Sequence, residues 1–174
     1  MNKNHNSNIK QTEANNNQNS DLIKTEVLLG FGSNLGDRRG FIEQGWAAVC
    51  GLVGVEAVCI SSLIETQAVG GELNQPDFLN AAGLIRTTLL PEILLDRLQE
   101  IENSFGRIRT VRWGARTLDI DILLYGNSII NTNRLKVPHP LMFQRNFVLI
   151  PASEIAPEMI LTVANTHGII LENF

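Results

Sequence analysis

Residues 106–125 read Gly-Arg-Ile-Arg-Thr-Val-Arg-Trp-Gly-Ala-Arg-Thr-Leu-Asp-Ile-Asp-Ile-Leu-Leu-Tyr, a basic segment that runs into an apolar one. The second part, residues 118–125, has the apolar and β-branched composition typical of a strand. Side chains two residues apart share a face of a strand, so Asp119 and Asp121 point the same way. The apolar neighbours on the opposite face are Leu118, Ile120 and Ile122. We therefore predict a strand with one acidic face and one core face.

Five elements are predicted before this strand. Apolar or β-branched runs bounded by turn residues indicate strands, and apolar residues at intervals of three or four indicate helices. The predicted elements are a strand over 27–32, a helix after Asn34, strands over 55–66 and 78–87, and a helix from Pro91 to Gly106. We expect Asn34 to cap the first helix, with Asp37 three residues on. The order β-α-β-β-α-β predicts an α+β protein with a ferredoxin-like core.

The two ends of the chain differ from this core. Residues 1–24 are dominated by Asn, Gln, Ser and Lys, so we expect a disordered Asn-rich tail. Residues 25–174 are expected to form a single domain. After the last core strand, prolines at 138, 140, 151 and 157 predict C-terminal loops and short helices packed on the core.

Composition excludes several classes of protein. Hydrophobic residues make up 44% of the 174 residues and charged residues 18%, which rules out disorder throughout. The formal net charge of −4 disfavours general binding to nucleic acid or to an anionic membrane. No apolar run approaches the roughly 18 residues of a membrane span, and no secretory signal is evident, so a cytoplasmic location is expected. Cys50 and Cys59 match no disulfide scaffold or zinc motif, and we expect buried, reduced thiols.

The basic segment and the acidic strand face together predict a binding site. Four of the 14 Lys and Arg residues lie within positions 107–116. Two neighbouring carboxylates repel each other unless a cation lies between them, and Mg²⁺ takes one or two carboxylates together with substrate phosphates. Arginines bind phosphates through paired, charge-assisted hydrogen bonds. The combination favours a polyphosphate–metal site over the plain alternative, a solvated acidic face beside a solvated basic loop.

Three further features have a structural interpretation as well as a functional one. Residues 30–36, Gly-Phe-Gly-Ser-Asn-Leu-Gly, match neither the dinucleotide fingerprint nor the P-loop, and a tight turn with a helix cap explains their glycines. Trp113 is either a loop anchor packed on the core or a lid residue over a ligand. His139, between two prolines, is a hydrogen-bonding loop residue or a phosphate contact, and the first is the commoner role of a lone histidine.

Several short motifs follow one another along the chain. They are Gly32-Ser33-Asn34-Leu35-Gly36-Asp37, Glu65-Thr66, Gln75-Pro76-Asp77-Phe78-Leu79-Asn80, Gly106-Arg107, the run from Arg112 to Asp121, and Val137-Pro138-His139-Pro140 with Arg145 and Phe147. In this order they resemble the 6-hydroxymethyl-7,8-dihydropterin pyrophosphokinases of folate biosynthesis, over about residues 26–160. Each motif is weak alone, but the run that ends at Asp121 is specific and the ordered set is strong.

The resemblance implies an ATP-dependent enzyme. A diphosphoryl group passes from ATP to the hydroxymethyl oxygen of 6-hydroxymethyl-7,8-dihydropterin, and AMP is released. The resemblance also implies two Mg²⁺ ions bound by Asp119 and Asp121. No nucleic acid, membrane or obligate protein partner is expected.

The resemblance implies site residues for each part of this reaction. The catalytic residues are Arg107, Arg116, Asp119 and Asp121. The ATP-binding residues are Gln99, Glu102, Arg107, Arg109, Trp113, Arg116, His139 and Arg145. The pterin-binding residues are Thr66, Gln67, Val69, Phe78, Asn80, Trp113 and Phe147, with the ring between the two phenylalanines. A flat, polar heterocycle suits an aromatic slot that holds one amide.

Two residues depart from the pattern of the family. Gln67 stands where many relatives have proline, and Pro140 replaces an aromatic residue, so both affect substrate affinity rather than reaction type.

Two other functions are alternatives to this one. A ferredoxin-like RNA-binding module would need stacking rings and positive charge where Asp119 and Asp121 stand. A two-metal nuclease or nucleotide hydrolase would use the same carboxylates, and pterin-independent consumption of ATP would indicate it.

Overall fold

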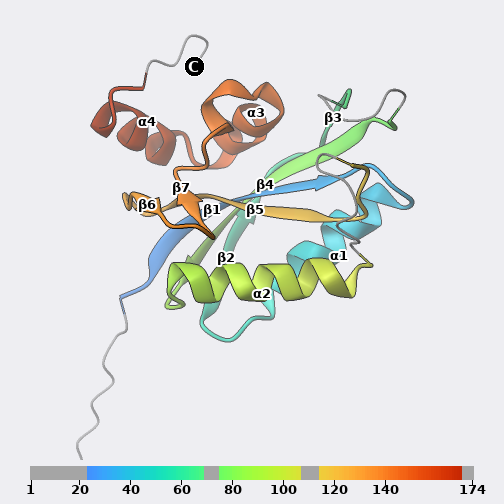
Figure 1. Ribbon diagram of the computed structural model, residues 1–174, viewed down its shortest axis with the longest axis horizontal. Coiled ribbons are helices and arrows are strands. Elements are labelled where there is room, and N and C mark those ends of the chain that lie inside the picture. Colours follow the sequence, from blue (N-terminus) through green and yellow to red (C-terminus); the bar gives the residue numbers. More distant parts are fainter. Residues whose placement is uncertain (1–22, 69–74, 107–113, 170–174) are drawn as a thin grey trace, which may run out of the picture.

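The computed structural model describes residues 23–68, 75–106 and 114–169 (Figure 1). The elements, in chain order, are β1 (Thr25–Ser33), α1 (Arg38–Cys50), β2 (Val55–Ile60), β3 (Ile64–Thr66), β4 (Phe78–Thr87), α2 (Pro91–Ser104), β5 (Asp119–Tyr125), β6 (Ile130–Asn131), β7 (Lys136–Val137), the 3₁₀ helix η1 (Met142–Gln144), α3 (Asn146–Ile155) and α4 (Pro157–Thr166). The predicted mixture of helices and strands is confirmed, and the central sheet is antiparallel.

An antiparallel sheet lies at the centre of the molecule. Its strands follow the order β2-β4-β1-β5, and the short β3 pairs with β4. β1 pairs with β4 along its whole length, from Thr25 opposite Thr87 to Ser33 opposite Leu79. On its other edge β1 pairs with β5. A separate hairpin, β6-β7, follows β5 in the chain.

Each face of the sheet carries an apolar cluster, because side chains alternate between the faces of a strand. Helices α1 and α2 lie on one face, where the buried cluster includes Leu29, Phe31, Leu94, Leu98, Leu118, Ile120 and Ile122. Helices α3 and α4 lie on the other face (Figure 1), with a cluster that includes Leu28, Leu123, Met142, Ala152 and Ile160. The predicted core face of the last strand, Leu118, Ile120 and Ile122, is confirmed.

The predicted strand over 55–66 is two strands, β2 and β3. Between them the side chain of Ser61 takes part in the sheet, because its Oγ accepts a hydrogen bond of 2.9 Å from the backbone N–H of Ala82. The next residue turns toward α3, where Glu154 accepts hydrogen bonds from the backbone N–H and the hydroxyl of Ser62. These side-chain bonds interrupt the strand.

Two other local predictions are wrong. The N-cap of α1 is Asp37, whose Oδ1 accepts a hydrogen bond of 3.0 Å from the backbone N–H of Gly40, and not Asn34. The amide of Asn34 instead bonds to residues far along the chain. Cys50 and Cys59 are free thiols, as expected, but both are only partly buried.

The chain ends add two observations. Residues 1–22 lie outside the described residues, so the disordered tail remains a prediction, while Lys24 forms an ion pair of 2.7 Å with Glu56 of β2. Across the described ranges, no single helix has the length and apolar character needed to cross a bilayer. Helices α3 and α4 meet that requirement only as a pair, and they are bent by 118°.

Candidate active site

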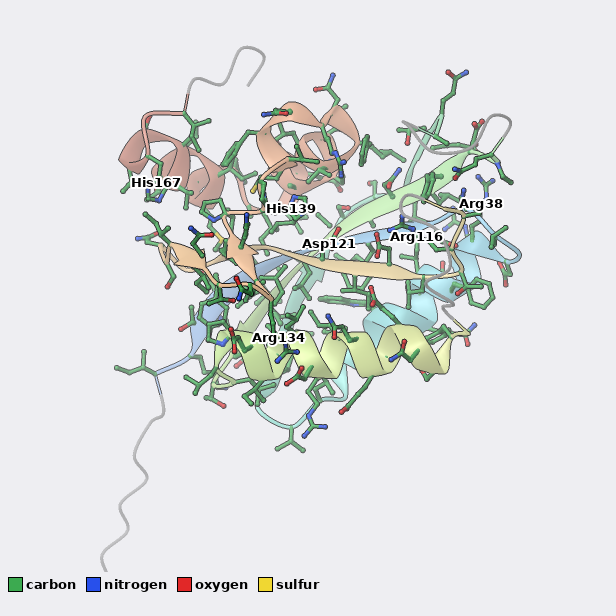
Figure 2. The ribbon with its side chains drawn as sticks, viewed as in Figure 1. Arg38, Arg116, Asp121, Arg134, His139 and His167 are labelled. Atoms are coloured by element: carbon green, nitrogen blue, oxygen red, sulfur yellow. The ribbon has the colours of Figure 1, made fainter. Side chains whose placement is uncertain are left out.

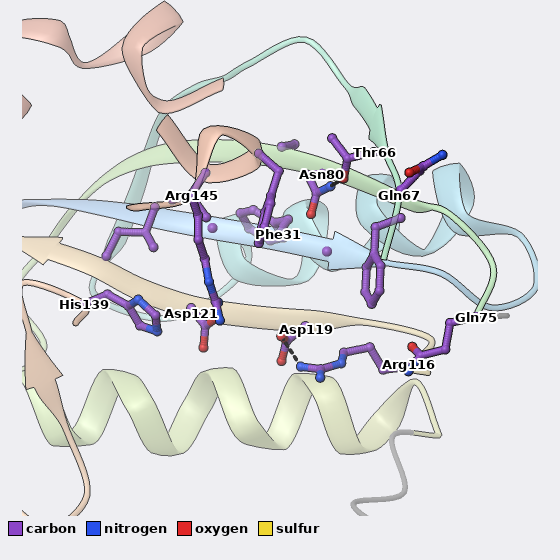
Figure 3. A pocket seen from close by; sticks show the side chains of 17 residues that line it. Phe31, Thr66, Gln67, Gln75, Asn80, Arg116, Asp119, Asp121, His139 and Arg145 are labelled. Carbon is purple, nitrogen blue, oxygen red and sulfur yellow. Dashed lines mark hydrogen bonds and ion pairs between the residues drawn. The ribbon is translucent and has the colours of Figure 1, made fainter. Parts of the chain in front are cut away.

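A cavity of about 210 Å³ opens on the sheet face that carries α3 (Figure 3). β1 forms its floor, and β5 and β4 lie on opposite sides of that floor. Its lining residues are Gly30, Phe31, Gly32, Thr66, Gln67, Gln75, Phe78, Asn80, Ala81, Arg116, Asp119, Asp121, Leu123, His139, Arg145, Phe147 and Val148. We call Arg116, Asp119, Asp121, His139 and Arg145 the charged side, and Thr66, Gln67, Phe78 and Asn80 the neutral side.

Two glycines of β1 keep the floor free of side chains. Gly30 lies opposite Asp121 and Gly32 opposite Asp119 in the ladder between β1 and β5. A Cβ atom at Gly32 would lie 3.5 Å from Oδ1 of Asn80 and 3.9 Å from Cβ of Asp119, in the space between the two sides. The interpretation of these glycines as parts of a tight turn is wrong, because they lie within β1. Gly36, with φ +62°, is the turn glycine.

The charged side alternates acidic and basic groups. Asp119 and Asp121 line the cavity from β5, as the strand pattern predicts. Arg116 forms an ion pair through Nη1 with Oδ2 of Asp119, and its Nε donates a hydrogen bond of 3.3 Å to the carbonyl oxygen of Gly114. The guanidinium of Arg145 points toward Asp121 (Figure 3). Nearby cations of this kind let two carboxylates share one strand face.

Glu102 of α2 supports β5 from the opposite face of the sheet. Its side chain is buried, with 1% of its surface exposed. Oε1 accepts a hydrogen bond of 2.7 Å from the backbone N–H of Ile120, the residue between Asp119 and Asp121. A buried backbone donor at the edge of a sheet needs such an acceptor, so Glu102 fixes the strand that carries both carboxylates.

His139 completes the charged side, and Figure 2 shows Asp121 between His139 and Arg116 along β5. The backbone N–H of His139 donates a hydrogen bond of 2.9 Å to the carbonyl oxygen of Leu123. Nδ1 of the ring accepts one of 3.3 Å from the N–H of Leu141. Burial lowers the pKa of His139, the charge of Arg145 lowers it further, and Asp119 opposes them. The neutral ring with the proton on Nε2 can therefore donate into the cavity.

The neutral side presents an amide with a fixed orientation. Asn80 has 6% of its surface exposed, and its Nδ2 donates a hydrogen bond of 2.9 Å to Oγ1 of Thr66. The two residues come from paired strands, because β3 pairs with β4 through Ile64 opposite Asn80 and Thr66 opposite Phe78. A buried amide beside an aromatic ring suits a flat ligand with donors and acceptors at its edge.

Phe147 lies near the start of α3. It lines the cavity together with Phe78 of β4. The guanidinium carbon of Arg145 lies 5.5 Å from the centre of the Phe147 ring, within the range of a cation–π contact. This contact links the charged side to one of the two aromatic residues predicted to hold the pterin.

The structure brings most of the predicted site residues together. Those that line the cavity are Thr66, Gln67, Phe78, Asn80, Arg116, Asp119, Asp121, His139, Arg145 and Phe147. Gln99 and Glu102 lie on α2 and do not line it, so their contacts with the nucleotide remain predictions. Val69, Arg107, Arg109 and Trp113 lie outside the described residues.

Other lining residues were missed as site residues by the sequence analysis. Gly30 and Gly32 carry a signal that was available, since they alternate on β1 as Asp119 and Asp121 alternate on β5. Gln75 belongs to a quoted motif, but it was assigned no role. Backbone and apolar positions such as Ala81, Leu123 and Val148 carry no such signal, because they are ordinary core residue types.

The donor set of the charged side fits a hard cation. Asp119 and Asp121 supply carboxylate oxygens on one strand face, and Mg²⁺ commonly binds one or two carboxylates and completes its shell with water and substrate phosphates. In the described part of the chain, no three His, Cys, Asp or Glu side chains are grouped so as to hold a metal ion. The arrangement suits a cation that arrives with a phosphate ligand rather than a closed structural metal site.

Comparison with known proteins gives one consistent family. The profile of the 7,8-dihydro-6-hydroxymethylpterin-pyrophosphokinase (HPPK) family matches residues 28–157. Relatives named 2-amino-4-hydroxy-6-hydroxymethyldihydropteridine pyrophosphokinase include those of Bacillus subtilis, 46% identical over 133 residues (76% of this chain, 79% of that protein), and Haemophilus influenzae, 44% identical over 135 residues (78% and 84%). The Aquifex aeolicus protein of the same name is 42% identical over 134 residues (77% and 82%).

Solved structures show the same fold. Wild-type Plasmodium falciparum HPPK-DHPS matches with a TM-score of 0.60 and 12% identity, over 85% of this chain and 47% of that chain. The same protein with pterin and p-hydroxybenzoate matches with a TM-score of 0.58 and 12% identity, over 88% and 46%. This chain therefore spans less than half the length of those structures, and the likeness to them concerns the fold. The family profile and the relatives together show that the chain belongs to the 7,8-dihydro-6-hydroxymethylpterin-pyrophosphokinase family.

Proposed function

We propose that this chain transfers a diphosphoryl group from ATP to 6-hydroxymethyl-7,8-dihydropterin, in folate biosynthesis. Family membership supports the reaction, and the observation that carries it is a cavity with a charged side and a neutral side over a glycine floor. The strand order supports a ferredoxin-like core within a single domain of residues 25–174. A cytoplasmic location remains a prediction from the sequence.

The reaction forms one phosphorus–oxygen bond and breaks another. A bond forms between the hydroxymethyl oxygen and the β-phosphorus of ATP, and the bond from that phosphorus to the bridging oxygen of AMP breaks. The proton of the hydroxyl group is released. Phosphoryl-type transfer depends mainly on positioning and electrostatic stabilisation, so no protein nucleophile is needed.

The charged side is proposed to bind the triphosphate. Arg116 and Arg145 present guanidinium groups that can each pair with phosphate oxygens, and Nε2–H of His139 can donate to another. Asp119 and Asp121 are proposed to hold two Mg²⁺ ions, which when bound would neutralise charge on the transferred group. Glu102 holds the backbone between these carboxylates, which keeps both aimed into the cavity.

The neutral side is proposed to bind the pterin. Its ring would lie between Phe78 and Phe147 above the bare floor at Gly32. Asn80, fixed by Thr66, would satisfy donors and acceptors at the ring edge, and Gln67 lines the same side. The assignments of Val69, Arg107, Arg109 and Trp113, and of Gln99 and Glu102 near the nucleotide, rest on the family resemblance alone.

The test is the identity of the nucleotide product. The purified chain is incubated with ATP and Mg²⁺, with and without 6-hydroxymethyl-7,8-dihydropterin, and AMP and ADP are quantified. The proposal expects AMP in step with pterin diphosphate, and only when the pterin is present. Release of ADP, or consumption of ATP without pterin, would contradict it and would favour a nucleotide hydrolase.

A further inference from the structure

Asn34 occupies the point where both sides of the cavity begin. β1 ends at Ser33, which pairs with Leu79 of β4, and one residue earlier Gly32 pairs with Asp119 of β5. Asn34 is therefore the first residue beyond both ladders. Only 1% of its surface is exposed, although its side chain is polar. A buried amide has to find hydrogen-bond partners in the protein.

The partners of Asn34 on the charged side are both main-chain groups of Arg116. Oδ1 of Asn34 accepts a hydrogen bond of 2.7 Å from the backbone N–H of Arg116, and the backbone N–H of Asn34 donates one of 3.1 Å to its carbonyl oxygen. The main chain of Arg116 is thereby fixed on both flanks. The side chain of Arg116 therefore extends from a fixed backbone position, and its guanidinium forms the ion pair with Asp119.

The partners of Asn34 on the neutral side lie just before β4. Nδ2 donates a hydrogen bond of 3.2 Å to the carbonyl oxygen of Pro76 and contacts Oε1 of Gln75 at 3.4 Å. Gln75 lines the cavity, and Figure 3 shows it at the same end as Arg116. Two residues after Pro76, β4 begins with Phe78, followed by Asn80. The same amide therefore holds the approach to the neutral side.

We infer that Asn34 is a positioning residue that fixes Arg116 through Oδ1 and the Gln75–Pro76 segment through Nδ2, and so sets the spacing between the two substrate sites. This inference rests on the proposed function, because it assigns the nucleotide to the charged side and the pterin to the neutral side. Neither bond is made to a substrate, so Asn34 acts through the residues it holds. Oδ1 therefore affects the nucleotide through Arg116, and Nδ2 affects the pterin through the Gln75–Pro76 segment.

The two ends of the amide can be separated by substitution. Asn34→Ala removes the acceptor and the donor, whereas Asn34→Asp keeps an oxygen that can accept from the N–H of Arg116 and loses the donor to Pro76. Burial raises the pKa of the new aspartate from the ordinary value of about 3.9, and measurements at about pH 8, about four units above that value, keep it ionised. A buried polar residue far from the cavity provides the matched control.

Thr87 is that control. It has 1% of its surface exposed, and its hydroxyl donates to the carbonyl oxygen of Gly54 at 2.9 Å and accepts from the N–H of Leu89 at 3.0 Å. It lies at the opposite end of β4 from Phe78 and does not line the cavity. Thr87→Ala therefore removes comparable buried hydrogen bonds, and it is expected to lower the melting temperature without changing either affinity.

The experiment measures the dissociation constant of a non-hydrolysable ATP analogue with Mg²⁺, and that of the pterin in the presence of saturating analogue. Asn34→Ala should weaken both by about tenfold or more, equivalent to about 1.4 kcal/mol each. Asn34→Asp should weaken the pterin by about tenfold and leave the nucleotide within about threefold, because a lost hydrogen bond in a buried site is of that order.

Three outcomes are distinguishable. If both Asn34 variants bind both ligands like Thr87→Ala, Asn34 is only structural and the inference is overturned. If Asn34→Ala does not fold, the unequal losses expected for Asn34→Asp still decide, and equal losses for the two ligands overturn the inference. If the parent chain yields no pterin-dependent AMP, the proposed function fails instead, independently of the variants.

Discussion

β5 and β4 border the same glycine floor, but they are held in different ways. β4 pairs with β1 on one edge and with β2 and β3 on the other, so backbone hydrogen bonds fix the neutral side. Among the described strands, β5 pairs only with β1. Its other edge depends on Glu102, which accepts from Ile120, and on His139, which donates to Leu123.

The difference indicates that the neutral side is rigid, whereas the charged side is held by ion pairs that can be exchanged. The proposed pterin site has a buried amide whose position is set by paired strands, which suits a ligand of fixed shape. The proposed triphosphate site instead contains ion pairs such as that of Arg116 with Asp119. Ion pairs can exchange one anion for another when the substrate enters. We therefore expect substitutions on the charged side to lower activity or ligand affinity more than substitutions on the neutral side.

The largest effect is expected from the two carboxylates. Asp119→Ala and Asp121→Ala should each lower Mg²⁺-dependent AMP formation by more than about 100-fold, because several kcal/mol of charge stabilisation is proposed to depend on them. Both variants should fold, since the loss of one of two like charges relieves repulsion on that strand face, which offsets the loss of the ion pair with Arg116 at Asp119. The assay uses the purified variants with thermal melts as the folding control. Parental turnover in either one contradicts the metal assignment.

Arg116 is expected to rank second. Arg116→Ala should retain measurable activity but lose roughly 10- to 100-fold in turnover or nucleotide affinity, because a hydrogen bond to a charged group contributes about 1.5–3 kcal/mol. Arg116→Lys keeps the charge without the planar fork and should fall between the alanine variant and the parent. An alanine variant with unchanged steady-state kinetics would remove Arg116 from the phosphate site.

The support of β5 by Glu102 makes a stability prediction. Glu102→Leu leaves the buried N–H of Ile120 without its acceptor and should lower the free energy of unfolding by about 1–3 kcal/mol. Glu102→Gln keeps an oxygen at the same place and should lose less. Urea unfolding of both variants, each with an activity assay, checks this order. Equal stability of the leucine variant and the parent would show that β5 needs no support at this edge.

Phe147 is expected to have a smaller and more selective effect. Phe147→Ala should weaken pterin binding by about threefold to tenfold, because an aromatic stacking contact contributes about 0.5–1.5 kcal/mol. The nucleotide should lose less, since only the contact with Arg145 is affected. Phe147→Tyr keeps the ring and serves as the control. Calorimetric titration with each ligand gives the comparison, and a larger loss for the nucleotide would reverse the proposed roles.

The smallest effect is expected from the N-terminus. Removal of residues 1–23 should change the melting temperature and the rate of AMP formation very little, because the segment offers almost no apolar residues to a core. A thermal melt of the truncated chain checks this. A clear drop in melting temperature would show that the segment packs on the domain.

Local periodicity was enough to predict the strand that carries Asp119 and Asp121. The alternation of two acidic residues with Leu118, Ile120 and Ile122 puts the acidic and the apolar side chains on opposite faces of a strand, and the structure shows this arrangement. The glycines of β1 follow the same rule, but glycine is also the commonest turn residue. Their role as a floor becomes visible only when β4 and β5 lie on either side.

The hydrogen bonds of Asn34 could not be predicted from its neighbours in the sequence. A capping rule considers partners three residues away, and Asp37 satisfies it. The amide of Asn34 instead bonds to the backbone of Arg116, 82 positions away. Likewise, the sequence marked Glu102 through family resemblance, but only the packing of α2 on the sheet shows that it bonds to Ile120.

The separation of the cavity into two sides is tested most directly by a crossed titration of Arg116→Ala and Asn80→Ala. Each variant and the parent are titrated with the ATP analogue plus Mg²⁺, and with the pterin at saturating analogue. We predict that Arg116→Ala weakens the nucleotide by about tenfold or more and the pterin by less than about threefold, and that Asn80→Ala does the reverse. If both variants weaken the same ligand, or each weakens both equally, the charged and neutral sides are not separate substrate sites.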